Sequence, residues 1–245
     1  MGQILAVVSG KGGTGKTSLC AAVACRLAEM GQTVLCIDAD AGLRNLDISL
    51  GMSQEAALPF TAVMDGTYPL SKAGVHPKFE TLRFLTAPVT TQPEEVDEAA
   101  FFELLRQAKQ EFDWVMVDAP AGVGAGFRLA VTKADLAMVV TGADPAALRD
   151  GARTSEALFG ISQAEAKIVV NRIRPRFFKK VRFTVDDCMD TVGLPLLGIV
   201  PEDEAVALCA ASGKPLRRSG KKSAFEASKH IAMRLLGKKV ALLDI

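Results

Sequence analysis

Short apolar runs alternate with longer amphipathic stretches along most of this chain, and the alternation predicts strands and helices in turn. Runs rich in Val, Ile and Leu predict buried strands at 4–9, 34–38, 82–87, 114–118, 136–141, 167–171 and 196–200. Stretches with apolar residues at helical spacing predict helices at 16–30, 94–111, 145–159, 185–192 and 223–236. Strands that are apolar on both faces are typical of a parallel sheet covered by helices on both sides. The pattern therefore predicts an α/β fold with a mostly parallel sheet.

The predicted elements fit one domain that spans residues 1–245. A length of 245 residues suits a single α/β unit, and the 49% apolar content supplies its core. The range 51–75, which carries Pro59 and Pro69, is the least regular part. The first strand begins almost at Met1, which leaves no room for a signal peptide, and no apolar run is long enough to cross a bilayer. We therefore expect one P-loop NTPase domain if the motif described next binds phosphate.

A glycine-rich segment, Gly-Lys-Gly-Gly-Thr-Gly-Lys-Thr at 10–17, joins the first predicted strand to the first predicted helix. Glycines in this context let backbone N–H groups cradle phosphate oxygens at a helix N-terminus. Lys16 is expected to contact the β- and γ-phosphates, and the Thr17 hydroxyl is expected to bind Mg²⁺. The nucleotide-binding residues predicted here are Gly10, Lys11, Gly12, Gly13, Thr14, Gly15, Lys16, Thr17 and Ser18.

Carboxylates follow two of the predicted strands. Asp118 ends the strand at 114–118, and Asp38 and Asp40 stand at and just beyond the end of the strand at 34–38. Ligands of parallel sheets bind at the carboxyl ends of the strands. We therefore expect Asp38 and Asp118 to support Mg²⁺ and Asp40 to orient the attacking water. The alternative for Asp38 and Asp40 is that they cap the following turn at the surface.

Lys11, at the second position of the loop, has no evident duty at the nucleotide of its own subunit. It either stays solvated or reaches a nucleotide bound to a facing subunit. The segment 11–17 resembles the signature of the MinD/ParA family of deviant Walker A ATPases. The segment 38–47, Asp-Ala-Asp-Ala-Gly-Leu-Arg-Asn-Leu-Asp, most resembles the MinD branch of that family, the septum site-determining proteins.

The resemblance covers 1–236 and implies ATP or ADP with Mg²⁺ as cofactors, and slow hydrolysis of ATP to ADP and phosphate. It implies a monomer that becomes an ATP-sandwich homodimer, with Lys11, Lys16 and Asp40 as the catalytic residues. The segments 169–175 and 198–206 resemble the adenine-side motifs of the family. This likeness implies that the base is bound by Asn171, Arg172, Pro201 and Asp203, with the amide of Asn171 on the adenine edge.

Composition limits the partners. The formal net charge of +1 gives no electrostatic argument for nucleic-acid binding. The five cysteines lack metal-ligand spacing, which argues against an iron–sulfur cluster and fits a reducing cytoplasm. The residues after Gly237 are too few for an amphipathic membrane helix, so the tail is not expected to bind lipid. The basic segment 172–182 carries Phe177 and Phe178, which either tuck into the core or contact lipid or bases.

The resemblance also implies protein partners, either MinC- and MinE-like or ParB-like, and a role in cell-division site selection or related positioning. The expected location is the cytoplasm, with peripheral association at the inner face of the cell membrane left open. Two alternatives remain at this point. One is a ParA-type or flagellar-placement ATPase that acts on DNA or another scaffold. The other is a nucleotide-gated binding module with negligible turnover.

Overall fold

An eight-stranded sheet runs through the computed structural model, which describes residues 1–41, 44–89, 91–181 and 184–244. The strand order is β3-β4-β2-β5-β1-β6-β7-β8. All neighbouring strands pair in parallel except β3 and β4. The strands are β1 (Gln3–Val8), β2 (Val34–Asp38), β3 (Gly74–Val75), β4 (Leu82–Leu85), β5 (Trp114–Asp118), β6 (Leu136–Thr141), β7 (Glu165–Ile173) and β8 (Leu196–Pro201). The predicted α/β class with a mostly parallel sheet is confirmed.

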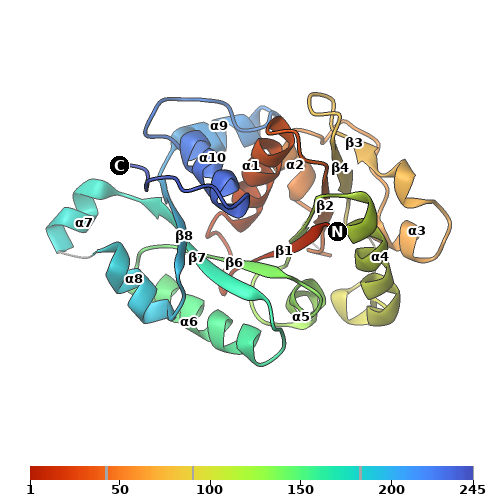
Figure 1. Ribbon diagram of the computed structural model, residues 1–245, viewed down its shortest axis with the longest axis horizontal. Coiled ribbons are helices and arrows are strands. Elements are labelled where there is room, and N and C mark those ends of the chain that lie inside the picture. The colour runs from red at the N-terminus through yellow and green to blue at the C-terminus, as the bar shows by residue number, and fades with distance from the viewer. Residues whose placement is uncertain (42–43, 90, 182–183, 245) are drawn as a thin grey trace.

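Helices cover both faces of this sheet (Figure 1). One layer contains α1 (Lys16–Glu29), α2 (Leu46–Leu50), α9 (Glu204–Ala211) and α10 (Ala224–Leu235), and the other contains α4 (Glu98–Glu111), α5 (Ala125–Val131), α6 (Pro145–Phe159) and α8 (Val185–Val192). The remaining helical segments are α3 (Phe60–Met64), η1 (Leu70–Lys72), η2 (Pro93–Glu95) and α7 (Pro175–Val181). Each layer closes its own hydrophobic core against one face of the sheet. The strands are buried on both faces for this reason, as their apolar runs predicted.

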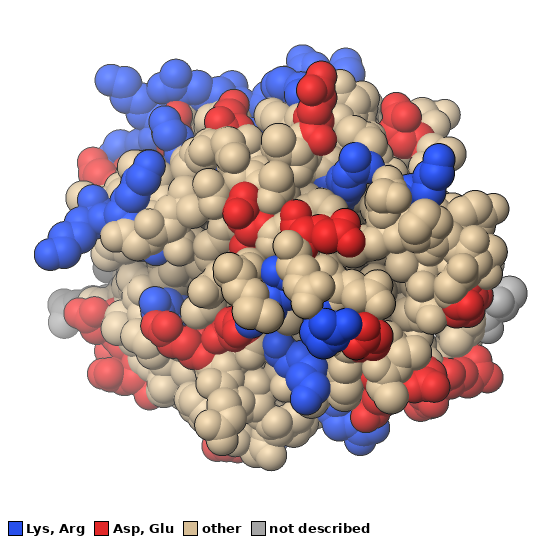
Figure 2. Space-filling model, turned by 45° about the vertical axis from the view of Figure 1, so that its right-hand side comes forward, with Lys and Arg blue, Asp and Glu red and all other residues tan. Residues whose placement is uncertain are grey.

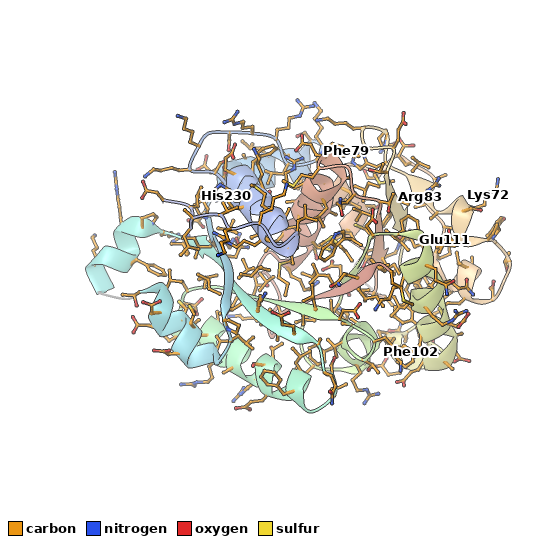
Figure 3. The ribbon with its side chains drawn as sticks, in the orientation of Figure 1. Lys72, Phe79, Arg83, Phe102, Glu111 and His230 are labelled. Carbon is orange, nitrogen blue, oxygen red and sulfur yellow. The ribbon has the colours of Figure 1, made fainter. Side chains whose placement is uncertain are left out.

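Several predicted boundaries need correction. The helix predicted at 94–111 is two elements, because η2 ends at Glu95 and α4 begins anew at Glu98. Asp97 caps α4 by accepting a hydrogen bond from Ala100 N (3.1 Å). The strand predicted at 167–171 is longer, Glu165–Ile173. Within the irregular range 51–75, the structure forms α3, η1 and β3. Arg83 of β4 reaches toward the segment that carries Lys72 (Figure 3) and donates to the carbonyls of Ser71 (3.1 Å) and Ala73 (3.2 Å).

The basic segment 172–182 is partly helical, since α7 occupies Pro175–Val181. Phe178 is half-buried and packs against the core below the sheet. This observation agrees with the core alternative for Phe178. The side chain of Phe177 lies outside the described residues. So do Arg182 and two residues of the segment 38–47, Gly42 and Leu43.

The C-terminal tail, residues 238–244, has no regular secondary structure and lies against the protein. Gly237 follows α10 and has φ +73°, the left-handed conformation that often ends a helix at glycine. Arg234 donates to the carbonyls of Leu197 (3.1 Å), Val240 (2.9 Å) and Ala241 (2.8 Å). Leu243 packs against both hydrophobic cores. In the described part of the chain, no helix is both long enough and apolar enough to cross a membrane.

Candidate functional site

The glycine-rich loop joins β1 to α1 at the carboxyl edge of the sheet. Gly13 (φ +80°) and Gly15 (φ +85°) adopt the left-handed conformation that glycine tolerates best. No side chain caps the N-terminus of α1 at Lys16, so its first N–H groups can serve a ligand. An anion is the ligand that such a helix end prefers.

Lys16 and Asp118 form a buried ion pair at the floor of this loop. Lys16 Nζ lies 2.7 Å from Asp118 Oδ1, and the two side chains are 6% and 1% exposed. Lys16 Nζ also lies 3.4 Å from the hydroxyl oxygen of Thr17. Burial raises the pKa of the Asp118 carboxyl, and the charge of Lys16 opposes that rise. The pair therefore places a cation, Lys16, where a phosphate would bind and an anion, Asp118, where a metal ion would bind.

The second oxygen of Asp118 is suited to a metal ion. Asp118 Oδ2 is buried and has no hydrogen-bond partner among the described residues. An orphaned buried carboxylate oxygen is costly unless a ligand or water completes it. The Thr17 hydroxyl lies at the same floor, close to Lys16. Oxygen donors of this kind fit Mg²⁺, which usually keeps several waters and takes one or two carboxylates.

Asp38 lies beside Asp118 on the neighbouring strand, since the two residues are paired in the register of β2 and β5. Its side chain is 1% exposed and accepts hydrogen bonds from Asp40 N (3.0 Å) and Leu46 N (3.2 Å). Burial, with the nearby charge of Asp118, raises the pKa of Asp38 to about 7. A bound cation would favour the charged form of both carboxylates. Asp38 thus caps the following turn, as the alternative predicted, but it does so while buried and not at the surface.

Asp40, two residues beyond Asp38, is more exposed than Asp38. It is half-buried, and burial raises the pKa of its carboxyl while the charge of Lys16 opposes the shift. The hydrogen bond from its backbone N–H to Asp38 fixes the turn that carries it. A half-buried carboxylate close enough to feel the charge of Lys16 can orient water beside a phosphate.

A cavity of about 750 Å³ lies beside the loop, between β7, β8 and α9. Its lining includes Gly13, Gly15, Ser18, Asn171, Arg172, Pro201 and Asp203. The structure thus brings all four predicted base-binding residues together next to the loop. Asp203 is tied to its own surroundings: its carboxylate accepts from Ala205 N, Ser219 Oγ and Ala224 N, each at 2.9 Å. Asp203 therefore shapes the wall of the cavity by joining α9 to α10.

Asn171 and Arg172 contact the loop directly. Asn171 Nδ2 donates to the carbonyl of Thr14 (2.7 Å), and Arg172 Nη1 donates to the carbonyl of Gly13 (2.9 Å). No local pattern predicted these contacts, because the partners are 157 and 159 positions apart. The Thr14 hydroxyl is buried without a hydrogen-bond partner among the described residues, which sequence reasoning also missed.

Lys11 lies in the loop with its side chain exposed, and it is not among the residues that line this cavity. A second hollow of about 420 Å³ lies beside the loop, lined by Lys11, Gly12, Asp144 and Phe178 among others. On the face drawn in Figure 2, Lys and Arg side chains gather toward the upper left, while the rest mixes both signs. The two hollows adjoin, since Gly13, Asn171, Arg172 and Glu202 line both, and Lys11 is exposed beside the smaller one.

Comparisons with known proteins agree with this geometry. The CobQ/CobB/MinD/ParA nucleotide binding domain matches residues 5–216. The septum site-determining protein MinD of Synechocystis sp. is 36% identical over 250 residues, covering 100% of this chain and 93% of that protein. MinD of Bacillus subtilis is 35% identical, covering 99% of this chain and 92% of that protein.

Solved structures give the same result. The MinC:MinD cell division protein complex of Aquifex aeolicus contains a chain with a TM-score of 0.89 and 31% identity, covering 98% of each chain. MinD of Pyrococcus horikoshii, complexed with Mg-ADP, has a TM-score of 0.81 and 26% identity, covering 96% of each chain. The predicted resemblance is confirmed. The chain belongs to the MinD/ParA family of nucleotide-binding ATPases, and it is MinD-like within that family.

Proposed function

We propose that this MinD-like ATPase binds ATP with Mg²⁺ beside the glycine-rich loop, hydrolyses ATP slowly to ADP and phosphate, and acts in division-site selection. One observation carries the proposal: the buried pair of Lys16 and Asp118, with one oxygen of Asp118 left for a metal ion. The names of the relatives, which are septum site-determining proteins, support the process. The Mg-ADP bound to the P. horikoshii relative supports the cofactor.

Each residue of the proposed site has its own role in binding and hydrolysing ATP. Mg²⁺, when bound, neutralises charge on the β- and γ-phosphates. Thr17, Asp38 and Asp118 would hold it. Lys16 would leave its pairing with Asp118 and bind the phosphates, because phosphate oxygens carry more charge than one carboxylate. Asp40 would hold the attacking water by accepting its hydrogen bond.

The cavity beside the loop would receive the base and sugar. Ser18 and the loop backbone from Gly10 to Thr17 would contact the phosphates, and Pro201 with Asp203 would form the wall against the base. Asn171 and Arg172 contact the loop carbonyls and line the same cavity as Pro201 and Asp203. This arrangement supports a nucleotide lying with its phosphates at α1 and its base near α9.

Lys11 supports a homodimer that forms with ATP. It is exposed, and it lines the smaller hollow beside the loop but not the cavity of about 750 Å³. A facing subunit would bring a second nucleotide within its reach, and a charge-assisted contact to phosphate would then stabilise the dimer. Lys16, Asp40 and the partner's Lys11 would form one catalytic set.

A MinC-like protein is the partner that the comparisons favour, since one related structure is a MinC:MinD complex. A MinE-like or ParB-like partner stays a prediction. We place the protein in the cytoplasm. The contacts of Arg234 with the tail support a tail that stays on the protein and does not bind lipid. They also support residues 1–245 as one domain, because Leu243 joins both cores.

Nucleotide binding tests the site. Titration calorimetry of ADP and ATP with Mg²⁺ should show binding by the wild-type chain, and binding should weaken strongly in Lys16→Ala. Asp190→Ala, an exposed acid of α8, serves as a control and should bind as the wild type does. Chelation of Mg²⁺ should weaken binding in the wild type. Equal affinities for the wild type and Lys16→Ala would refute the proposed site.

A further inference from the structure

A hydrogen bond from Ser9 holds the peptide unit that follows Lys11. Ser9 Oγ donates to the carbonyl of Lys11 (3.1 Å), and Ser9 is only 1% exposed. Lys11 itself is exposed, as are Gly12 and Gly13. A donor that is buried under the glycine-rich loop therefore restrains the exposed part of that loop.

The backbone of Ser9 is itself firmly held. Ser9 directly follows β1, and its carbonyl accepts a hydrogen bond from Gly122 N (2.9 Å) in the segment after Asp118. The next residue, Gly10, packs so closely on α6 that a Cβ atom there would lie 2.4 Å from the carbonyl oxygen of Asp150. The hydroxyl of Ser9 therefore extends from a fixed point of the protein.

The chain beyond Gly10 has little support from packing. A Cβ atom built on Gly12 or Gly13 would meet no heavy atom of the described residues within 4 Å, apart from its neighbours in the chain. Glycine also has the widest choice of φ and ψ. Further along, Arg172 donates to the carbonyl of Gly13. Between Gly10 and that contact, the bond from Ser9 is the restraint on the backbone that the structure shows in its described part.

A fixed carbonyl fixes a whole peptide plane. A trans peptide unit is planar, so the direction of the Lys11 carbonyl sets the orientation of the unit that joins Lys11 to Gly12. The side chain of Lys11 starts from the edge of that plane, so its ammonium group samples a smaller region when the plane is held. A group that is ordered before binding loses less entropy when it binds.

We propose that Ser9 is a positioning residue for Lys11, which orders the loop so that the Lys11 ammonium meets the phosphates bound to a facing subunit. The proposal rests on the proposed ATP-dependent homodimer. It predicts that two effects separate. Loss of the Ser9 hydroxyl should weaken the contact between subunits, while the binding of ADP by one subunit stays nearly unchanged, because Lys16 and Thr17 are held by α1.

The test is Ser9→Ala introduced into an Asp40→Ala chain, which we expect to be a dimer with ATP. Light scattering over a range of protein concentrations, with ATP and Mg²⁺, gives the dissociation constant of the dimer. The loss of one hydrogen bond of ordinary strength corresponds to about fivefold in affinity. A symmetric dimer contains this bond twice, so the dissociation constant should rise about twenty-five-fold.

Ser162→Ala is the matched control. Ser162 is also buried, and its hydroxyl also bonds to the backbone two residues further on, accepting from Ala164 N (3.1 Å). It precedes β7 at the amino edge of the parallel strands, whereas the loop lies at their carboxyl edge. This variant should change the dissociation constant of the dimer by less than about twofold. Calorimetry with ADP should give nearly the same affinity for the wild type and for both serine variants.

A dynamic measurement tests the positioning itself. NMR relaxation of the Gly12 N–H, which belongs to the peptide unit that Ser9 holds, reports motion on the picosecond-to-nanosecond timescale. Without nucleotide, the order parameter of Gly12 should fall in Ser9→Ala and keep its wild-type value in Ser162→Ala. A serine that is needed only for stability would lower the thermal midpoint without this local change.

The possible outcomes separate the two proposals. An unchanged dimer dissociation constant or an unchanged Gly12 order parameter in Ser9→Ala would show that Ser9 does not position Lys11. An affinity for ADP that falls as much as the dimer affinity would show that Ser9 supports the whole loop, which also overturns the proposal. If the Asp40→Ala parent stays monomeric with ATP, the proposed homodimer is what fails, and the Gly12 order parameter then shows separately whether Ser9 holds the loop.

Discussion

The ammonium of Lys16 lies 2.7 Å from Asp118 Oδ1, and both side chains are buried below the loop. A buried pair of this kind is stable only while both members remain, because either one alone is a buried charge without a partner. It therefore connects the stability of the empty protein with the chemistry of the site. When a phosphate and a metal ion arrive, each member can exchange its partner for a new one.

Replacing Asp118 with alanine should destabilise the nucleotide-free protein by about 3 kcal/mol, because Lys16 then loses its buried partner. Urea unfolding without nucleotide measures this change. The exposed variant Asp190→Ala should differ from the wild type by less than about 0.5 kcal/mol. An Asp118→Ala variant as stable as the wild type would show that the pair does not hold the loop in place.

Acid should destabilise the protein partly through His76. His76 Nδ1 accepts from the N–H groups of Lys78 (3.0 Å) and Phe79 (3.2 Å), and Nε2 lies 2.9 Å from the carbonyl of Leu50. These contacts need the neutral ring, and burial lowers the pKa of His76. The unfolded chain then binds a proton at higher pH than the folded chain does. Stability is thus present above the unfolded pKa and declines as pH falls through the folded one.

His76→Asn tests this dependence. An asparagine side chain can accept from the N–H two residues on, as it does in many turns, but it does not titrate. The free energy of unfolding should therefore fall less between pH 7 and pH 5 in the variant than in the wild type. Urea titrations at several pH values measure how the free energy of unfolding changes with pH. Identical slopes in the variant and the wild type would show that His76 does not contribute to this dependence.

The tail should come loose when Arg234 is replaced. Arg234→Met loses the donors that hold Val240 and Ala241, so hydrogen exchange at 238–244 should become faster. Lys238→Met, which keeps those contacts, should exchange as the wild type does. If anionic liposomes sediment the wild-type chain but not a chain lacking 238–245, the tail is a lipid anchor after all.

Lys11 should be needed for the dimer. Asp40→Ala with ATP should be a dimer by light scattering, because it binds ATP without turning it over, and Asp40→Ala with Lys11→Ala should be a monomer. Adding Lys72→Ala in place of Lys11→Ala replaces an exposed lysine of η1 and should leave the dimer intact. If Asp40→Ala and Asp40→Ala with Lys72→Ala both stay monomeric with ATP, the proposed dimer is contradicted.

The sequence predicted the sheet well because its strands are buried on both faces and read as unbroken apolar runs. It missed α9, whose Ala-rich stretch lacks a period and begins at the Asp203 cap. It also missed α7, where Pro175 opens a helix inside a run of charges. The residues of the glycine-rich loop, and the carboxylates Asp38, Asp40 and Asp118, were predicted from local sequence spacing. The partners of Asn171 and the role of Asp203 depend on contacts between distant segments, which no local pattern encodes.

The central claim is that this site hydrolyses ATP with Asp40 orienting the water. The most direct measurement is phosphate release from ATP and Mg²⁺ under saturating nucleotide, for the wild type, Asp40→Ala and the control Asp190→Ala. We predict that Asp40→Ala binds ATP as the wild type does, while its turnover falls by about one to three orders of magnitude. Equal turnover in the wild type and Asp40→Ala, with ATP bound by both, would contradict the account.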